Sequence, residues 1–244
     1  MTCVLLVGGT DSSGGAGLSR DVSFATRLGC FAKPVVTCVT AQTNSAVQKV
    51  HQVPTDVVAA QIETALNDQR PGAIKIGMVG TRTMANTIAD ALKSFTGPIV
   101  LDPVLKSTSG GQLGQSDALD RLLAMASLLT PNLDEAAALT GRMRRPGTDN
   151  VVKQAADLQK LGAKAVLIKG GHGTDVLCYD HLFDADGHLP IALPRLARGR
   201  RGTGCALATA IACFLASGSS LRDACQHGKA QVHNWIGETD AVRW

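Results

Sequence analysis

Aromatic side chains are scarce in this 244-residue chain, at 3% of its residues. So few rings leave little material for stacking unpaired bases, and a formal net charge of +4 is too mild to indicate nucleic-acid binding. No hydrophobic run reaches the length of a membrane span, and the apolar run at residues 3–7 is too short for a signal peptide. The composition therefore disfavours nucleic-acid and membrane partners, whereas a mild positive charge suits small anionic ligands.

The chain also lacks a C-x-x-C motif, and its seven cysteines are an odd number. Several of these cysteines lie within apolar runs. Such a set argues against a disulfide framework and for reduced thiols. We therefore expect a cytoplasmic protein.

Short β-branched runs alternate with longer helical patterns, and no internal repeat, linker or low-complexity segment interrupts them. This alternation predicts an α/β fold of parallel βαβ units, with helices on both faces of one sheet. The length suits a single domain over residues 1–244. The predicted strands are 4–7, 34–40, 47–53, 73–79, 98–101, 127–129 and 165–168, with a small antiparallel patch at 175–179 and 189–193. The predicted helices are 14–28, 54–66, 81–95, one that begins near residue 132, 148–161, 203–216 and 221–236.

Polar and glycine-rich segments follow most of these strands. They are residues 8–11, 42–44, 77–78, 102–103, 132 and 169–171. In an open α/β sheet, ligands bind outside the carboxyl ends of the strands. We therefore expect these segments to converge on one site.

A glycine-rich turn, Arg201-Gly202-Thr203-Gly204-Cys205, runs directly into an alanine-rich apolar helix. A helix N-terminus presents unpartnered N–H groups and a partial positive charge, and glycines let that backbone approach a phosphate closely. Cys205 then lies where an anion and a reacting group could meet. An ordinary turn before a buried helix is the alternative.

Three further segments are open to two interpretations each. The segment 8–17 lacks the spacing of a dinucleotide site or a P-loop, so its glycines indicate either turn chemistry or a ligand against the backbone. Asn132 and Glu135 have the spacing of a capping box, but with Asp102 they could also hold hydrated Mg²⁺. Asp21 is either a surface charge or a polar anchor.

Four arginines precede the glycine turn. They are Arg195, Arg198, Arg200 and Arg201. Arginine suits phosphate oxygens geometrically, so we expect one or two of the four to face the site.

In their order along the chain, these motifs resemble the hydroxymethylpyrimidine/phosphomethylpyrimidine kinase family of thiamine biosynthesis, within the ribokinase-like superfamily. The matching segments are 9–11, 13–17, 40–42, 75–78, 101–104, 130–133, 135–136, 169–172 and 202–205. The resemblance implies a three-layer α/β/α sandwich with a mostly parallel central sheet. It also implies ATP-dependent phosphorylation of 4-amino-5-hydroxymethyl-2-methylpyrimidine, with Mg²⁺, to the monophosphate and then to the diphosphate. Homodimers are common in this family.

The resemblance also implies roles by position. Gln42 would hydrogen-bond the aminopyrimidine edge, and Asp21 would face the acceptor hydroxymethyl group. The remaining residues are Gly9, Ala16 and Val104 for the ring pocket; Gly202, Thr203, Gly204 and Cys205 for the anion hole; Asn132, Lys169, Lys229 and Arg201 for the nucleotide; and Asp102 and Glu135 for the metal.

Cys205 is also the expected general base. At a helix start, its thiol pKa should lie below the free value of about 8.5, and the thiolate could accept the hydroxymethyl proton. In the second step the acceptor is a phosphate that is already ionised at neutral pH, because its second pKa is about 6. The arginine cluster could serve that step.

Two other functions compete with this hypothesis. One is a pyridoxal or pyridoxine kinase of the same superfamily; Gln42 favours the aminopyrimidine, because an amide pairs with adjacent donor and acceptor atoms. The other is an inactive pyrimidine-binding sensor, which the presence of Cys205, Asn132 and Glu135 disfavours. The chain departs from the family pattern at Ser12, Thr43, Arg201 and Ala206, and the role of Arg201 stays open.

Overall fold

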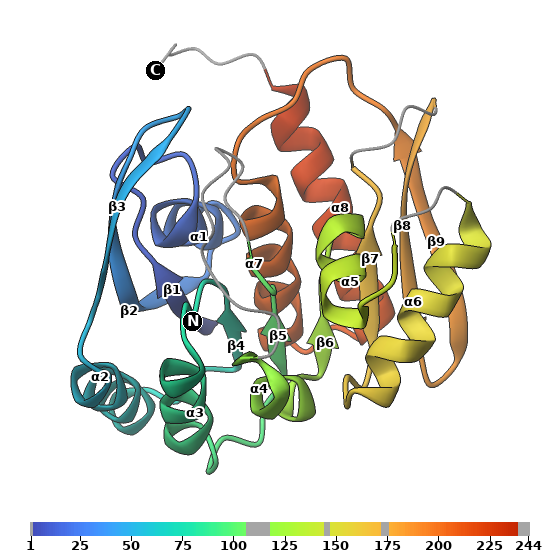
Figure 1. Cartoon of the computed structure of the whole chain (residues 1–244). Coiled ribbons are helices and arrows are strands. Elements are labelled where there is room, and N and C mark those ends of the chain that lie inside the picture. The colour runs from blue at the N-terminus through green and yellow to red at the C-terminus, as the bar shows by residue number, and fades with distance from the viewer. Residues whose placement is uncertain (1, 106–117, 144–146, 172–175, 239–244) are drawn as a thin grey trace.

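The computed structural model describes residues 2–105, 118–143, 147–171 and 176–238 (Figure 1). A nine-stranded sheet runs through this part of the chain in the order β3-β2-β1-β4-β5-β6-β7-β8-β9. Its strands are β1 (Cys3–Gly9), β2 (Phe31–Gln42), β3 (Val47–Gln52), β4 (Ala73–Ile76), β5 (Ile99–Leu101), β6 (Leu128–Leu129), β7 (Val166–Lys169), β8 (Leu177–Asp184) and β9 (Gly187–Pro194).

The centre of the sheet is parallel and its margins are antiparallel. Strands β2, β1, β4, β5, β6 and β7 pair in parallel, while β3 at one margin and β8–β9 at the other pair antiparallel. Every residue of β1 is buried, as expected for a parallel strand covered on both faces. The predicted antiparallel patch is confirmed as a longer hairpin of two eight-residue strands. The start predicted for it, at residue 175, lies outside the described residues.

Helices cover both faces of this sheet (Figure 1). α1, α7 and α8 pack on one face, and α2 to α6 pack on the other. The helices are α1 (Gly17–Arg27), α2 (Thr55–Asp68), α3 (Arg82–Ala91), α4 (Asp120–Met125), α5 (Leu133–Thr140), α6 (Thr148–Lys160), α7 (Thr203–Ala216) and α8 (Leu221–Gly237). The predicted three-layer α/β/α sandwich is therefore confirmed. The six-residue α4 was not predicted, because so short a helix shows no readable period.

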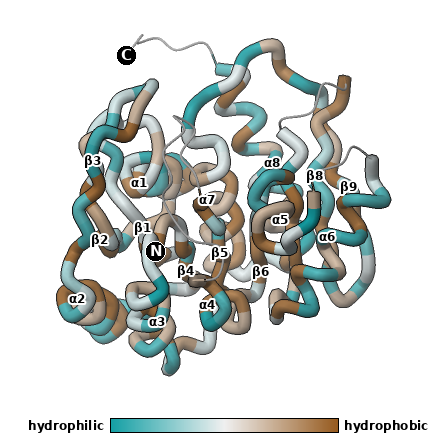
Figure 2. Tube along the Cα trace, viewed as in Figure 1, coloured by the Kyte–Doolittle hydropathy of each residue, from teal (hydrophilic) through white to brown (hydrophobic). Residues whose placement is uncertain are grey.

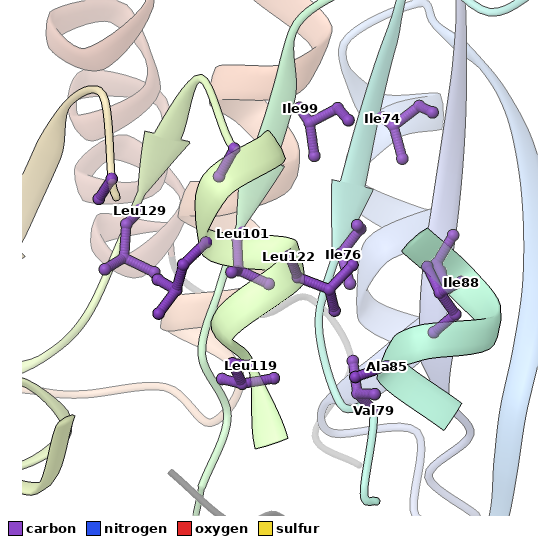
Figure 3. Close-up of a cluster of buried hydrophobic side chains, with 14 of the residues drawn as sticks. Ile74, Ile76, Val79, Ala85, Ile88, Ile99, Leu101, Leu119, Leu122 and Leu129 are labelled. Carbon is purple, nitrogen blue, oxygen red and sulfur yellow. The ribbon is translucent and has the colours of Figure 1, made fainter. Parts of the chain in front are cut away.

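Successive residues of the central strands supply the two halves of the core. Leu5 and Val7 belong to the cluster under α2 to α6, while Val4 and Leu6 of the same strand face α1. Figure 3 shows the first cluster, with side chains of β4, β5 and β6 directed at α3 and α4. Fully burying each large aliphatic side chain contributes about 1.5–3 kcal/mol.

Helix α7 is the most deeply buried of the three helices on the face that carries α1, α7 and α8. Its residues from Ala206 to Cys213 are all buried, and Figure 2 shows it as largely hydrophobic. With 14 residues it is nevertheless shorter than the roughly 20 residues that a membrane-spanning helix needs. Within the described part of the chain, no helix combines the length and apolarity required to cross a membrane.

Candidate active site

The carboxyl ends of the parallel strands border a cavity of about 450 Å³. Asn132, beyond β6, forms an isolated parallel bridge with Lys169 of β7, which keeps these two strand ends in register. Every residue that the sequence assigned to the site lines this cavity: Gly9, Ala16, Asp21, Gln42, Asp102, Val104, Asn132, Glu135, Lys169, Arg201, Gly202, Thr203, Gly204, Cys205 and Lys229.

The turn before α7 requires glycine. Gly202 has a left-handed φ of +78°, and a Cβ at this position would lie 2.4 Å from the carbonyl oxygen of Gly15. No side chain among the described residues caps α7. The N–H groups of its first turn are therefore available to an anion in the cavity.

Asp11 organises the glycine-rich loop that follows β1. Its buried carboxylate accepts hydrogen bonds from the N–H and the hydroxyl of Ser13 at 2.9 and 2.7 Å, and from the N–H of Ala16 at 2.9 Å. Gly17 then has a φ of +57°, and a Cβ there would lie 2.4 Å from the carbonyl oxygen of Gly9. The loop therefore continues to residue 16, and α1 begins at Gly17 rather than at residue 14 as predicted.

Gln42 is fixed at the end of β2 by this loop. The hydroxyl of Ser12 donates to the Gln42 carbonyl and accepts from its N–H, both at 2.8 Å. The hydroxyl of Thr40 lies 3.2 Å from the side-chain oxygen Oε1 of Gln42. The carboxamide thus has a defined place in the wall of the cavity.

Among the described residues, five ion pairs between largely buried side chains border the cavity. They are Arg201–Asp11 at 3.1 Å, Lys75–Asp21 at 2.7 Å, Lys169–Asp102 at 2.7 Å, Lys169–Glu135 at 3.9 Å and Lys229–Asp180 at 2.8 Å. Burying two charges costs solvation energy that their attraction repays only in part. Their concentration at the strand ends makes this edge of the sheet the candidate functional site.

Asp21 joins α1 to β4 and α7. Its carboxylate is fully buried, and it accepts hydrogen bonds from Lys75 Nζ at 2.7 Å and from the Thr209 hydroxyl at 2.8 Å. These two bonds hold α1 against β4 and α7, so the expectation of a polar anchor is confirmed. Asp21 also lines the cavity, and its contact with an acceptor hydroxymethyl group stays a prediction.

The expected low pKa of the Cys205 thiol is wrong. Burial raises this pKa to about 11, although the nearby Lys75 ammonium lowers it. The free-energy cost of removing a thiolate from water is larger here than the stabilisation of the thiolate by the cation and the helix N-terminus. The thiol is therefore protonated at neutral pH in the unliganded protein.

Asn132 and Glu135 form the capping box that their spacing allows. The side-chain oxygen of Asn132 accepts from the N–H groups of Asp134 and Glu135 at 2.9 and 2.8 Å, and Glu135 accepts from the N–H of Asn132 at 2.8 Å. Burial raises the pKa of Glu135 to about 7, although the nearby Lys169 ammonium lowers it. The structural interpretation is thus confirmed, and a nucleotide role for these residues stays a prediction.

The carboxylates of Asp102 and Glu135 flank one ammonium. Lys169 Nζ lies 2.7 Å from Asp102 and 3.9 Å from Glu135. In the described ranges, no three His, Cys, Asp or Glu side chains gather to ligate a metal. Two carboxylates are too few for a Mg²⁺ site made by protein ligands alone. They fit a Mg²⁺ ion that keeps most of its waters and also binds phosphate oxygens.

Lys229 and Arg201 lie at different parts of the cavity wall. Lys229 bonds to Asp180, which also accepts the N–H of Gly170 at 2.9 Å and so holds the chain after β7. The ion pair of Arg201 joins it to Asp11 in the glycine-rich loop, on the acceptor side. Its predicted contact with a nucleotide stays a prediction. Residue 172, in the last part of the matching segment 169–172, lies outside the described residues.

Four residues at the site were not predicted from the sequence: Lys75, Asp11, Asp180 and Thr209. Lys75 carried the clearest signal, because it is a lone charge in the apolar strand Ala-Ile-Lys-Ile, which is buried throughout. A buried lysine needs an acidic partner. Asp21 and Thr209 are distant in sequence, so only the fold identifies them as neighbours.

Comparison with known proteins places this site in a family. Residues 11–243 match the family described as phosphomethylpyrimidine kinase. A hydroxymethylpyrimidine/phosphomethylpyrimidine kinase of Rhizobium meliloti (strain 1021) is 39% identical over 248 residues, which cover 99% of this chain and 93% of the relative.

Solved structures agree with this assignment. The phosphomethylpyrimidine kinase of Clostridium difficile 630 has a TM-score of 0.83 at 31% identity and covers 97% of this chain and 100% of its own. A Bacillus subtilis pyridoxal kinase in an ADP complex has a TM-score of 0.89 at 26% identity, with coverages of 100% and 94%. The chain is therefore a phosphotransferase with a ribokinase-like fold, and it belongs to the phosphomethylpyrimidine kinase family.

Proposed function

We propose that this chain transfers a phosphoryl group from ATP to the hydroxymethyl group of 4-amino-5-hydroxymethyl-2-methylpyrimidine, and then a second one to the resulting monophosphate. The observation that carries the proposal is a single cavity that joins the pocket beside Gln42 to the turn from Gly202 to Cys205. The Rhizobium meliloti relative is named for both activities, and the ADP complex of the pyridoxal kinase supports ATP as the donor.

The acceptor pocket is formed by Gln42, Gly9, Ala16 and Val104. The carboxamide of Gln42 offers a carbonyl acceptor and an N–H donor side by side, which matches the amino group and ring nitrogen of an aminopyrimidine. The small residues let the ring lie against backbone. This arrangement directs the hydroxymethyl group towards the turn that begins α7.

Phosphoryl transfer needs alignment and charge neutralisation more than covalent help. The acceptor oxygen attacks the γ-phosphorus, the bond to the ADP oxygen breaks, and the hydroxyl proton passes to Cys205 in the fraction of molecules whose thiol is ionised to the thiolate. The N–H groups from Gly202 to Cys205 stabilise the charge on the transferred group, as in an oxyanion hole. Lys169 adds a cation here, because a Cβ on Gly204 would lie only 3.2 Å from its Nζ.

The nucleotide lies towards Asn132, Lys169 and Lys229 in this proposal. Asp102 and Glu135 would hold Mg²⁺ through water, and the bound ion would neutralise charge on the β- and γ-phosphates. Lys169 compensates both carboxylates when no metal is bound. These residues serve both phosphorylation steps equally, since the donor is the same.

The two steps should respond differently to pH. A thiol with a pKa of about 11 gains thiolate tenfold per pH unit, so kcat/KM for the pyrimidine rises about 100-fold from pH 7 to 9. The monophosphate acceptor is already ionised above a pKa of about 6, so its profile is flat over that range. The titration of Glu135 affects both steps and cancels in their ratio. Parallel profiles for the two acceptors would remove the thiol from the mechanism.

A second candidate function is phosphorylation of pyridoxal. The observation that favours it is the TM-score of 0.89 to a pyridoxal kinase. Its substrate also presents a hydroxymethyl group on a heteroaromatic ring, but lacks the amino group beside the ring nitrogen that Gln42 would bind. Parallel kinase assays with both acceptors decide between the functions, and a Gln42→Leu variant should lower only the pyrimidine activity.

The decisive experiment is a mass-resolved assay with ATP and the hydroxymethylpyrimidine. Monophosphate should form first and diphosphate second, each with one equivalent of ADP. Monophosphate without diphosphate would restrict the proposal to the first step. ADP without either product would contradict it.

We further propose a single kinase domain over residues 1–244 that works in the cytoplasm as a homodimer. All seven cysteines are free, which suits a reducing compartment. One continuous sheet passes through all four described ranges, which supports one domain. Size-exclusion chromatography with light scattering tests the homodimer.

A further inference from the structure

Arg201 joins three segments that are far apart in the sequence. Its Nη1 donates to the Ser13 hydroxyl at 2.6 Å and to Asn44 Oδ1 at 3.2 Å, while its Nη2 lies 3.1 Å from Asp11 Oδ2. Asp11 and Ser13 belong to the glycine-rich loop, and Asn44 belongs to the turn between β2 and β3. Arg201 itself directly precedes Gly202. One guanidinium therefore connects the glycine-rich loop and the turn between β2 and β3 to the start of α7.

This guanidinium is largely buried, and its hydrogen bonds within the described residues are made by Nη1, while Nε and Nη2 have none. The Arg201 side chain is 14% exposed and that of Asp11 is 3% exposed. The arginine also lies flat against the loop, since a Cβ on Gly15 would be 2.9 Å from its Nη1 and 3.3 Å from its Cδ. A planar fork with several fixed donors can bond to three acceptors at once, which a lysine ammonium on a flexible stem cannot reproduce.

The three joined segments carry the two halves of the proposed reaction. The glycine-rich loop after β1 supplies Ala16 to the ring pocket, and the turn between β2 and β3 begins directly after Gln42. The glycine-rich turn before α7 supplies Cys205 and the anion hole. Loop and turn also meet at the thiol, where the Gly17 N–H bonds to Cys205. The distance between acceptor oxygen and anion hole thus depends on how these segments are held together.

We propose that Arg201 is a positioning residue that latches the acceptor pocket onto the phosphoryl-transfer turn. The inference rests on the proposed kinase function. Arg201 acts through Asp11, Ser13 and Asn44, and it sets the alignment of whichever acceptor occupies the pocket. A misplacement of about 1 Å costs on the order of 100-fold in transfer rate, so the latch matters even though it takes no part in the chemistry.

The test is a double-mutant cycle of Arg201→Met and Asn44→Ala. Asn44 is exposed and does not line the cavity, so its removal loosens the latch without altering a wall residue. Arg201→Met should lower transfer to both acceptors about 100-fold and raise the ratio of ADP released to pyrimidine phosphate formed. Asn44→Ala should show part of the same change, and the double variant should be no worse than Arg201→Met. Arg201→Lys should recover only part of the transfer.

Two controls make the outcome decisive. Arg121→Met removes an exposed guanidinium–carboxylate pair with Asp90, remote from the cavity, and should leave both steps unchanged. Amide hydrogen exchange without substrate should quicken at Ala16 and Gln42 in Arg201→Met and Asn44→Ala, which tests the latch even if wild type makes no product and the proposed function fails. A loss confined to the monophosphate acceptor, with a silent Asn44→Ala, would make Arg201 a phosphate ligand and overturn the latch. Unchanged exchange in both variants would also overturn it.

Discussion

Replacing Cys205 with serine is expected to lower phosphorylation of the hydroxymethylpyrimidine by about 10²–10⁴-fold, the usual contribution of a general base. Serine has nearly the same shape, so the start of α7 and its N–H groups should stay in place. Its hydroxyl, however, is far less acidic than the thiol and supplies no base at neutral or mildly alkaline pH. The variant therefore removes proton transfer while it preserves the anion hole.

The second step supplies the internal control for this variant. Its acceptor is already ionised, so Cys205→Ser should slow transfer to the monophosphate far less than transfer to the pyrimidine. Initial rates with the two acceptors, at equal ATP, measure this difference. Thermal unfolding establishes that the variant is folded. First-step turnover close to wild type would show that Cys205 is not the base.

Features read from local pattern were predicted well from the sequence. The strands predicted at 4–7 and 98–101 are apolar runs bounded by glycine, proline or charge, and both are central strands of the sheet. The strand predicted at 73–79 is also central, but it ends at Ile76. The site residues were also foreseen as neighbours, because parallel strands place their carboxyl ends at one edge. That single topological fact brings Gln42 and Asp102 to the same cavity from sequence positions 60 residues apart.

Features that depend on burial and distant partners were not predictable. The thiol pKa of Cys205 was expected to fall because the helix start is visible in the sequence, whereas the desolvation that raises it is not. The partners of Asp21 are not visible in the sequence either, because nothing local reveals that its oxygens accept hydrogen bonds from Lys75 and Thr209. The partners of Arg201 are hidden in the same way, because the position of Asn44 relative to α7 is set only by the folded chain.

Lys75→Met is expected to destabilise the protein by about 3–5 kcal/mol, the cost of breaking a buried ion pair from one side. Lys75 and Asp21 are 1% and 0% exposed, so neither can turn to solvent when its partner is removed. Burial by itself lowers the pKa of Lys75, but the Asp21 carboxylate and other anionic groups raise it by more, so the ammonium stays charged. The variant therefore leaves an uncompensated carboxylate within the core. Urea unfolding monitored by circular dichroism measures the loss.

The double variant Lys75→Met with Asp21→Leu separates stability from function. Apolar side chains of similar size often replace a buried ion pair without loss, so the double variant should recover most of the stability. It should recover the first phosphorylation step less completely than the second, because Lys75 lowers the thiol pKa of Cys205 by more than Asp21 raises it. Its rate with the pyrimidine should stay below wild type at pH 8 while its rate with the monophosphate approaches wild type. Recovery of both rates would make the pair purely structural. If Lys75 of β4 favours the thiolate of Cys205, the double variant should regain its stability and its rate with the monophosphate, while its rate with the pyrimidine stays reduced.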